Sequence, residues 1–91
     1  MIRSNEIEGL KKRIGGNYIS RISVYFNQHM ILNKFNEPFS DSYISRVLNG
    51  KMPNKKVEDG IWKYAEELKK KEEMDAARKA KILEPIKIPK K

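Results

Sequence analysis

Cysteine is absent from this chain of 91 residues, and no run of about eighteen apolar residues is long enough to span a bilayer as a helix. Without cysteine the chain can form neither a disulfide nor a thiolate metal site, which suits a reducing cytoplasm. Residues 1–20 also lack the apolar segment of a secretion signal. We therefore expect a cytoplasmic protein that neither crosses a membrane nor carries a standard signal peptide.

The residues that perform most enzyme chemistry are scarce as well. His29 is the only histidine, and no acidic residue stands near it at the spacing of metal ligands. No pairing of a nucleophile with a base presents itself. Gly15-Gly16 is not followed by the Lys-Ser/Thr of a phosphate-binding loop. We expect no catalytic residue, no metal site, no cofactor and no enzymatic activity.

Basic residues are what the chain has in excess. Twenty Lys and Arg oppose 12 Asp and Glu, which gives a net charge of +8. A positive charge of this size favours a polyanionic partner, nucleic acid first and an anionic membrane second. Many proteins are basic only because charge keeps them soluble, so charge alone does not select the partner.

Apolar residues recur at helical spacing in four segments, which predicts an all-α fold. Asn5, with Glu8 three residues later, predicts the start of a first helix that stops at Gly15-Gly16. Asn17 is the expected cap of a second helix, which covers about residues 18–32. The apolar stripe of this second helix consists of Ile19, Ile22, Phe26 and Met30.

The segment between residues 33 and 39 has no period, and Pro38 disfavours a helical conformation for Glu37. We expect an ordered loop that extends the second helix and folds back on the core. Phe35 and Phe39 are expected to hold it there, because leaving both rings in water would forgo much apolar burial.

A fourth helix is expected to begin after Asn54 as its cap and to place Trp62 in the core. Beyond Leu68 the apolar content falls while helix-forming residues continue, so we expect a solvated rod that reaches towards residue 82. The apolar stripe of the fourth helix is Val57, Ile61, Ala65 and Leu68.

The prolines at 85 and 89 predict an extended basic tail after that helix. We therefore divide the chain into a compact domain over residues 1–68 and a charged helical extension with a basic tail over residues 69–91.

Residues 41–49 predict a short third helix with two different faces. Ser40 is a good N-cap, Phe39 and Ile44 hold the positions of a hydrophobic staple, and Gly50 holds the C′ position. Short polar side chains and an arginine are the types that pair with base edges in a major groove. An ordinary amphipathic surface helix would show the same pattern. The apolar stripe is Ile44, Val47 and Leu48, and the polar face is Asp41, Ser42, Ser45, Arg46 and Asn49.

The segment Phe39–Lys51 reads Phe-Ser-Asp-Ser-Tyr-Ile-Ser-Arg-Val-Leu-Asn-Gly-Lys. It resembles the recognition-helix segment of lactose-repressor-type helix-turn-helix domains and of small phage-repressor-like regulators. With the amphipathic helix that follows, the resemblance covers residues 39–68. It implies a four-helix helix-turn-helix domain that binds double-stranded DNA sequence-specifically, as a transcriptional regulator of bacterial or phage type. The family's pattern falls on Phe39-Ser40, then Asp41 and Ser42, Ile44, Ser45-Arg46-Val47 and Leu48-Asn49.

Two features depart from that family. Its motif joins the two helices by a turn of three or four residues, usually through a glycine. Here an insertion without glycine runs from about Gln28 to Pro38. These 91 residues also contain no counterpart of the family's sugar-binding domain, so we expect no small-molecule effector.

Individual roles follow from the polar face and from the resemblance. Asp41 is expected to accept from cytosine N4, or else to oppose the helix dipole at N1. Arg46 is expected to read a guanine, or else to pair on the surface with Asp41 or Glu37. The predicted base-reading residues are Asp41, Ser42, Ser45 and Arg46, and the predicted DNA-backbone contacts are Tyr43, Asn49, Lys51, Asn54, Lys55 and Lys56.

The expected partner is double-stranded DNA, bound by a possible homodimer that pairs through the helix of residues 57–82. The alternative is a non-enzymatic helical interaction or virion-associated protein that binds polyanions without reading sequence. Sequence readout requires Asp41, Ser42 and Arg46 to share one exposed face with basic residues around it.

Overall fold

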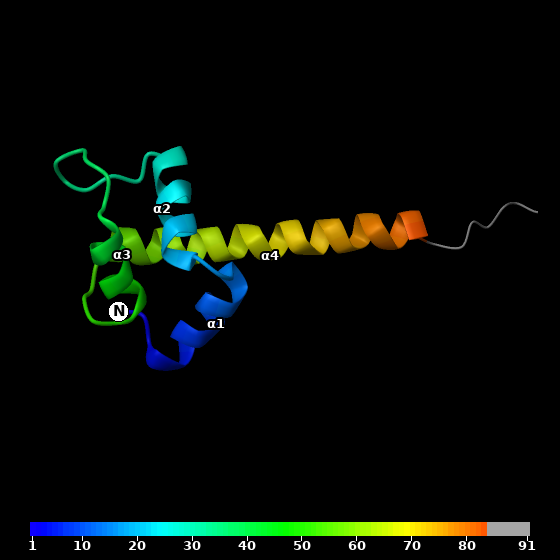
Figure 1. Ribbon diagram of the computed structural model, residues 1–91, viewed down its shortest axis with the longest axis horizontal. Helices are drawn as coiled ribbons and strands as arrows, with labels where there is room; N and C mark the ends of the chain where they lie inside the picture. The colour runs from blue at the N-terminus through cyan, green and yellow to red at the C-terminus, as the bar shows by residue number, and fades with distance from the viewer. Residues whose placement is uncertain (84–91) are drawn as a thin grey trace, which may run out of the picture.

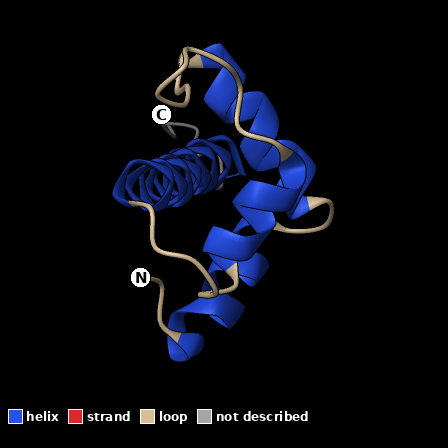
Figure 2. Cartoon of the chain, turned by 90° about the vertical axis from the view of Figure 1, so that its left-hand side faces the viewer, coloured by secondary structure: helices blue, strands red, loops and turns tan. Residues whose placement is uncertain are grey.

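The computed structural model describes residues 1–83, and within them it contains four helices and no strand. These are α1 (Ser4–Ile14), α2 (Tyr18–Gln28), α3 (Asp41–Leu48) and α4 (Lys55–Leu83). The prediction of an all-α fold is confirmed. The three shorter helices gather around the first half of α4, and its second half projects beyond them as a single rod (Figures 1 and 2).

All four helices contribute to the core, and α2 crosses α4 within it. Gly60 of α4 lies against the ring of Phe26, and a β-carbon at position 60 would stand 2.8 Å from that ring. Tyr25 donates a hydrogen bond of 2.8 Å to Glu67, which joins the same two helices. Burial, and then the hydrogen bond and charge of Glu67, raise the pKa of Tyr25 to about 12, so the phenol remains a donor at neutral pH. The other fully buried large side chains are Ile22, Ile44, Leu48, Ile61, Val47 and Val57.

The first helix begins slightly earlier than the sequence suggests. Arg3, and not Asn5, is the N-cap of α1, and the carboxylate of Glu6 accepts a hydrogen bond of 3.0 Å from the Arg3 amide. Asn17 precedes α2 as expected, but it has left-handed backbone angles and its side chain makes no cap hydrogen bond. The stop at Gly15 is confirmed.

The second helix ends four residues before the predicted position. Met30 has a φ of 55°, and the Ile31 amide donates to the carbonyl of Phe26 at 2.8 Å. The Met30 amide donates to Asn27, so the two bonds form a Schellman motif that closes the helix after Gln28. The apolar spacing continues through residue 30, but such spacing does not show that a residue has left-handed backbone angles. The predicted end of the helix is therefore too late.

Three predicted core side chains lie largely in water. Met30 is 70% exposed, Phe35 is 69% exposed and Trp62 is 41% exposed. Phe39 does pack on the core, and its ring makes an edge-type contact with that of Phe26 at 6.3 Å between centroids. The prediction that two phenylalanines hold the loop on the core is therefore right for Phe39 and wrong for Phe35.

The fourth helix reaches Leu83, which confirms the predicted rod. An ion pair of 2.6 Å between Arg13 and Glu72 holds it against α1 for one turn beyond Leu68. The predicted basic tail lies outside the described residues. None of the helices within residues 1–83 is long and apolar enough to cross a membrane.

Candidate nucleic-acid interface

The third helix has well-defined ends. The Ser40 hydroxyl accepts a hydrogen bond of 3.1 Å from the Tyr43 amide, so the predicted N-cap is confirmed. At the other end the Gly50 amide donates to Val47 and the Lys51 amide donates to Arg46, which forms a second Schellman motif. Gly50 has a φ of 72°, and its α-carbon lies so close to the Ile2 carbonyl that a β-carbon would stand 2.6 Å from that oxygen. Both the left-handed backbone and the nearby Ile2 carbonyl therefore require glycine at position 50.

The apolar stripe of α3 determines which side faces solvent. Ile44, Val47 and Leu48 are completely buried. The opposite side consequently exposes Asp41, Ser42 and Arg46, while Ser45 is half-buried. The predicted base-reading residues therefore lie on the outward side of α3, with only Ser45 partly covered.

Basic residues lie in and next to the loop that joins α3 to α4. Lys51 and Lys55 are exposed, and Lys55 makes an exposed ion pair of 3.3 Å with Asp59. Arg3 is exposed and follows Ile2, whose carbonyl faces Gly50. Exposed pairs of this kind contribute little to stability, so Lys55 can exchange Asp59 for another anion at low cost.

Four of the predicted DNA-backbone contacts, namely Tyr43, Asn49, Asn54 and Lys56, already make side-chain hydrogen bonds within the protein. Asn49 donates to the carbonyl of Ser45 at 2.8 Å and so caps its own helix. Asn54 donates to the Tyr43 hydroxyl at 2.7 Å, which ties the start of α4 to α3. The Lys56 ammonium donates to the Leu32 carbonyl at 2.6 Å and fastens the loop of residues 29–40 to α4. Asn49 and Asn54 thus hold α3 in place, and Lys56 holds the loop.

The start of α4 is closed by a reciprocal cap. The Asn54 side chain accepts from the Val57 amide at 3.0 Å, and the Glu58 carboxylate accepts from the Asn54 amide at 2.9 Å. The amino group of Met1 lies 3.1 Å from the other Glu58 oxygen. The backbone hydrogen bond from Asn54, and then the amino group, hold the pKa of Glu58 below its ordinary value.

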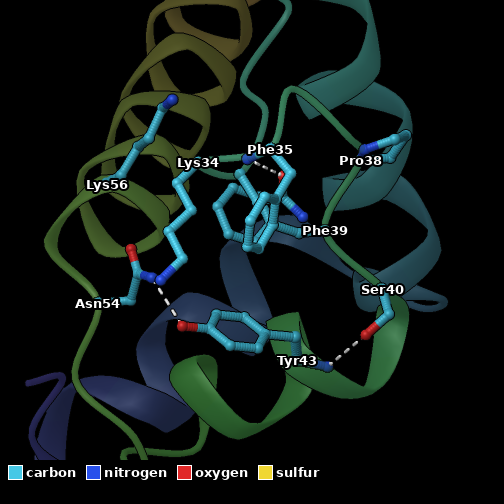
Figure 3. Close-up of a pocket in the computed structure, with 9 residues that line it drawn as sticks. Lys34, Phe35, Pro38, Phe39, Ser40, Tyr43, Asn54 and Lys56 are labelled. Carbon is cyan, nitrogen blue, oxygen red and sulfur yellow. Dashed lines mark hydrogen bonds between the residues drawn. The ribbon is translucent and has the colours of Figure 1, made fainter.

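A cleft of about 620 Å³ opens between the loop of residues 33–39 and the starts of α3 and α4 (Figure 3). Sequence reasoning did not predict this cleft. The available signal was the local mixture of aromatic and basic residues, but only the folded chain brings residues 33–39 next to residues 54–56. Aromatic and polar groups in its lining include Lys34, Phe35, Phe39, Tyr43, Asn54 and Lys56.

No cluster of three or more potential metal ligands occurs among the residues that the structure describes. Comparison of the chain with protein-family models, curated proteins and solved structures found no match. We therefore interpret the surface from its own residues.

Proposed function

We propose that this protein binds double-stranded DNA in a sequence-specific way, with α3 in the major groove and α2–α3 acting as a helix-turn-helix. One observation carries the proposal: α3 buries its whole apolar stripe and turns Asp41, Ser42 and Arg46 outward. Carboxylate, hydroxyl and guanidinium groups are suited to donors and acceptors on base edges. The similarity of residues 39–68 to lactose-repressor-type domains points to a transcriptional regulator in a bacterial or phage-infected cytoplasm.

The connection between the two motif helices differs from that of the family. It runs from residue 29 to residue 40, but it is fastened by the Schellman motif after α2 and by the bond from Lys56 to Leu32. A long connection held in this way is compatible with a fixed orientation of α3 relative to α2. In our proposal the insertion lengthens the turn without loosening the motif.

Phosphate contacts would surround the reading helix. Lys51, in the loop after α3, and Lys55, at the start of α4, carry exposed ammonium groups. Tyr43 accepts a hydrogen bond from Asn54, which leaves its own hydroxyl hydrogen to donate to a phosphate oxygen. These contacts would set the register of the helix without themselves reading sequence.

The decisive experiment selects preferred duplexes from a random pool and measures their affinity over a range of salt concentrations. Arg46→Ala should weaken binding to the selected site by about 1–3 kcal/mol and blur the preference at one base pair. Arg21→Ala removes an exposed arginine from α2 and is the matched control, which should retain the preference. An unaltered preference in the Arg46 variant would refute sequence readout by α3.

The alternative is polyanion binding without sequence readout, and the exposed charged rod at the end of α4 favours it. Lys69, Lys70 and Lys71 are all exposed there. If binding depends on this lysine run, replacing the three by alanine should weaken all duplexes equally and flatten the salt dependence. In that case Arg46→Ala would leave the ranking of duplexes unchanged.

The same rod is the candidate surface for a homodimer, which sedimentation of the free and DNA-bound protein would detect.

A further inference from the structure

At the cleft beside α3, an ordered loop holds the aromatic ring of Phe35 in solvent. Phe35 is 69% exposed, yet the residues around it are firmly hydrogen-bonded. The Asn33 side-chain oxygen accepts from the Phe35 amide at 2.8 Å and from the Glu37 amide at 3.0 Å. The Asn33 amide donates to the Glu37 carbonyl, and Leu32 and Pro38 form an antiparallel bridge. The loop therefore fixes an exposed ring that the core does not cover.

Two further rings make the cleft an aromatic site. The rings of Phe39 and Tyr43 lie 5.4 Å apart between centroids with their planes tilted by 31°, and both line the cleft with Phe35. In Figure 3 the Phe35 and Phe39 rings lie in the middle of the cleft, with Tyr43 next to them. Aromatic rings from the loop and from α3 thus line the same cleft.

Positive charge accompanies these rings. The Lys34 ammonium lies 5.4 Å from the centroid of Phe35, and Lys56 also lines the cleft. Lys56 uses one of its three donor hydrogens on the Leu32 carbonyl and keeps two. The lining contains no carboxylate, and the Tyr43 hydroxyl, which accepts from Asn54, still has a hydrogen to donate.

We infer that this cleft binds an unpaired nucleotide of a nucleic-acid strand. Its base stacks on Phe35 and Phe39, and its phosphate meets Lys34, Lys56 and the Tyr43 hydroxyl. An inorganic anion would leave the rings unused, and an uncharged apolar ligand would leave the ammonium groups unused. Stacking on aromatic rings inside a basic groove is the general way in which proteins hold single strands.

This inference does not depend on duplex readout by α3. The cleft uses the loop and the starts of α3 and α4, whereas base reading in a duplex uses Asp41, Ser42 and Arg46. Its occupant is a strand and not a free nucleotide, because the cleft is open to solvent at Phe35 and the chain as a whole is basic. Neighbouring phosphates of a strand would gain from that charge.

The test measures fluorescence anisotropy of a labelled oligothymidine of about 12 nucleotides with the whole protein, beside a duplex of equal length. Phe35→Leu keeps an apolar side chain and removes the aromatic face, so it should weaken single-strand binding about tenfold or more. Phe35→Trp should retain that binding. Met74→Ala, at a side chain 67% exposed on α4, is the matched control and should bind like the parent.

Charge is tested separately by the salt dependence. Lys34→Ala should reduce the slope of log affinity against log salt by about 0.7, the value of one phosphate contact on a single strand. Lys12→Ala, which removes an exposed lysine from α1, should leave the slope unchanged. Melting curves for each variant establish that the fold is retained.

Three results would overturn the inference. Equal single-strand affinity of the parent and Phe35→Leu would show that the Phe35 ring does not stack on a base. If Phe35→Leu weakened binding to the duplex alone, the loop would be a duplex contact. Competition by thymidine monophosphate at concentrations near the Kd of the strand would assign the cleft to a free nucleotide. If Arg46→Ala loses duplex preference while single-strand binding is retained, base reading by α3 and strand binding by the cleft stand as separate functions, which share only the Tyr43 hydroxyl as a phosphate contact.

Discussion

At the scale of single residues, the effect of a glycine on stability depends on which side chains lie close to its backbone. Gly60 permits α2 to cross α4, because a β-carbon there would stand 2.8 Å from the Phe26 ring. Gly9 lies within α1, and nothing stands within 4 Å of the place a β-carbon would occupy. Both positions are glycines within helices, and only their surroundings in the fold distinguish them.

Exchange of these glycines for alanine should therefore have opposite effects. Gly9→Ala should stabilise the protein by about 0.5–1 kcal/mol, since alanine is the better helix former. Gly60→Ala gains the same propensity but must displace an aromatic ring, and overpacking costs about 1–3 kcal/mol. We expect net destabilisation and a lower Tm. Equal stabilisation by both changes in denaturant titrations would contradict the crossing at Gly60.

Glu58 supplies a charge whose contribution depends on pH. Its folded-state pKa is lowered, first by the hydrogen bond from the Asn54 amide, so the charged form stabilises the folded protein. That contribution is fully present above the ordinary glutamate pKa of about 4.3 and disappears as the pH falls through the lowered value. Glu58→Gln should unfold more easily than the parent at pH 7.

The difference in unfolding free energy between parent and variant should shrink as the pH falls below about 4. Glutamine can still accept the Asn54 hydrogen bond, so the comparison isolates the charge. Urea titrations at several pH values measure it. A difference that is the same at every pH would assign the effect to packing and not to ionisation.

At the scale of elements, the ends of the helices decide how far each one runs. α3 ends at a glycine with left-handed angles, as its sequence indicates. α2 ends in the same Schellman geometry, but the left-handed position is occupied by Met30. A residue with a β-carbon is strained by about 1–2 kcal/mol in that conformation. The early end of α2 is therefore maintained against local strain by the packing of the loop that follows.

Met30→Gly should consequently stabilise the protein. The methionine side chain is 70% exposed, so little burial is lost when it is removed. Relief of the left-handed strain should exceed the added entropy of glycine in the unfolded chain, for a net gain of about 0.5–1 kcal/mol. Thermal unfolding monitored by circular dichroism checks this. A lower Tm would show that the side chain stabilises the turn by contacts that outweigh its strain.

On the scale of the whole molecule, the protein combines a packed body with an unsupported helical rod. Three helices cover the first half of α4, whereas the second half projects into solvent (Figure 1). Arg13 and Glu72 make the last described tie between the body and the rod. Most helical stability comes from tertiary packing, so the two halves of one continuous helix should differ in local stability.

Hydrogen exchange should reveal this difference along α4. Amides of residues 57–68 should exchange only through global unfolding, while those of residues 75–83 should exchange through local fraying with little protection. Arg13→Ala should move the boundary of protection towards Leu68. Uniform protection from residue 57 to residue 83 in the isolated protein would indicate that another surface covers the rod, as a dimer would.

Local signals in the sequence determined a large part of this architecture. Ser40 and Gly50 mark the ends of α3 through capping groups that act over three or four residues, and the apolar stripe around Ile44 determines which face is buried. The four helices follow from the same periodicity, and the length of α4 follows from the helix-forming residues that continue after Leu68. Such features are local because they depend on hydrogen bonds and burial patterns within one turn of helix.

Tertiary structure alone decided where the chain departs from those patterns. It exposes Phe35 and Trp62, ends α2 at Gln28, and brings the insertion beside α4 through the bond from Lys56 to Leu32. The physical reason is that each outcome depends on contacts between segments distant in sequence. The side chain and main chain of one element must be placed against another before a left-handed turn, an exposed ring or a cleft between them can exist.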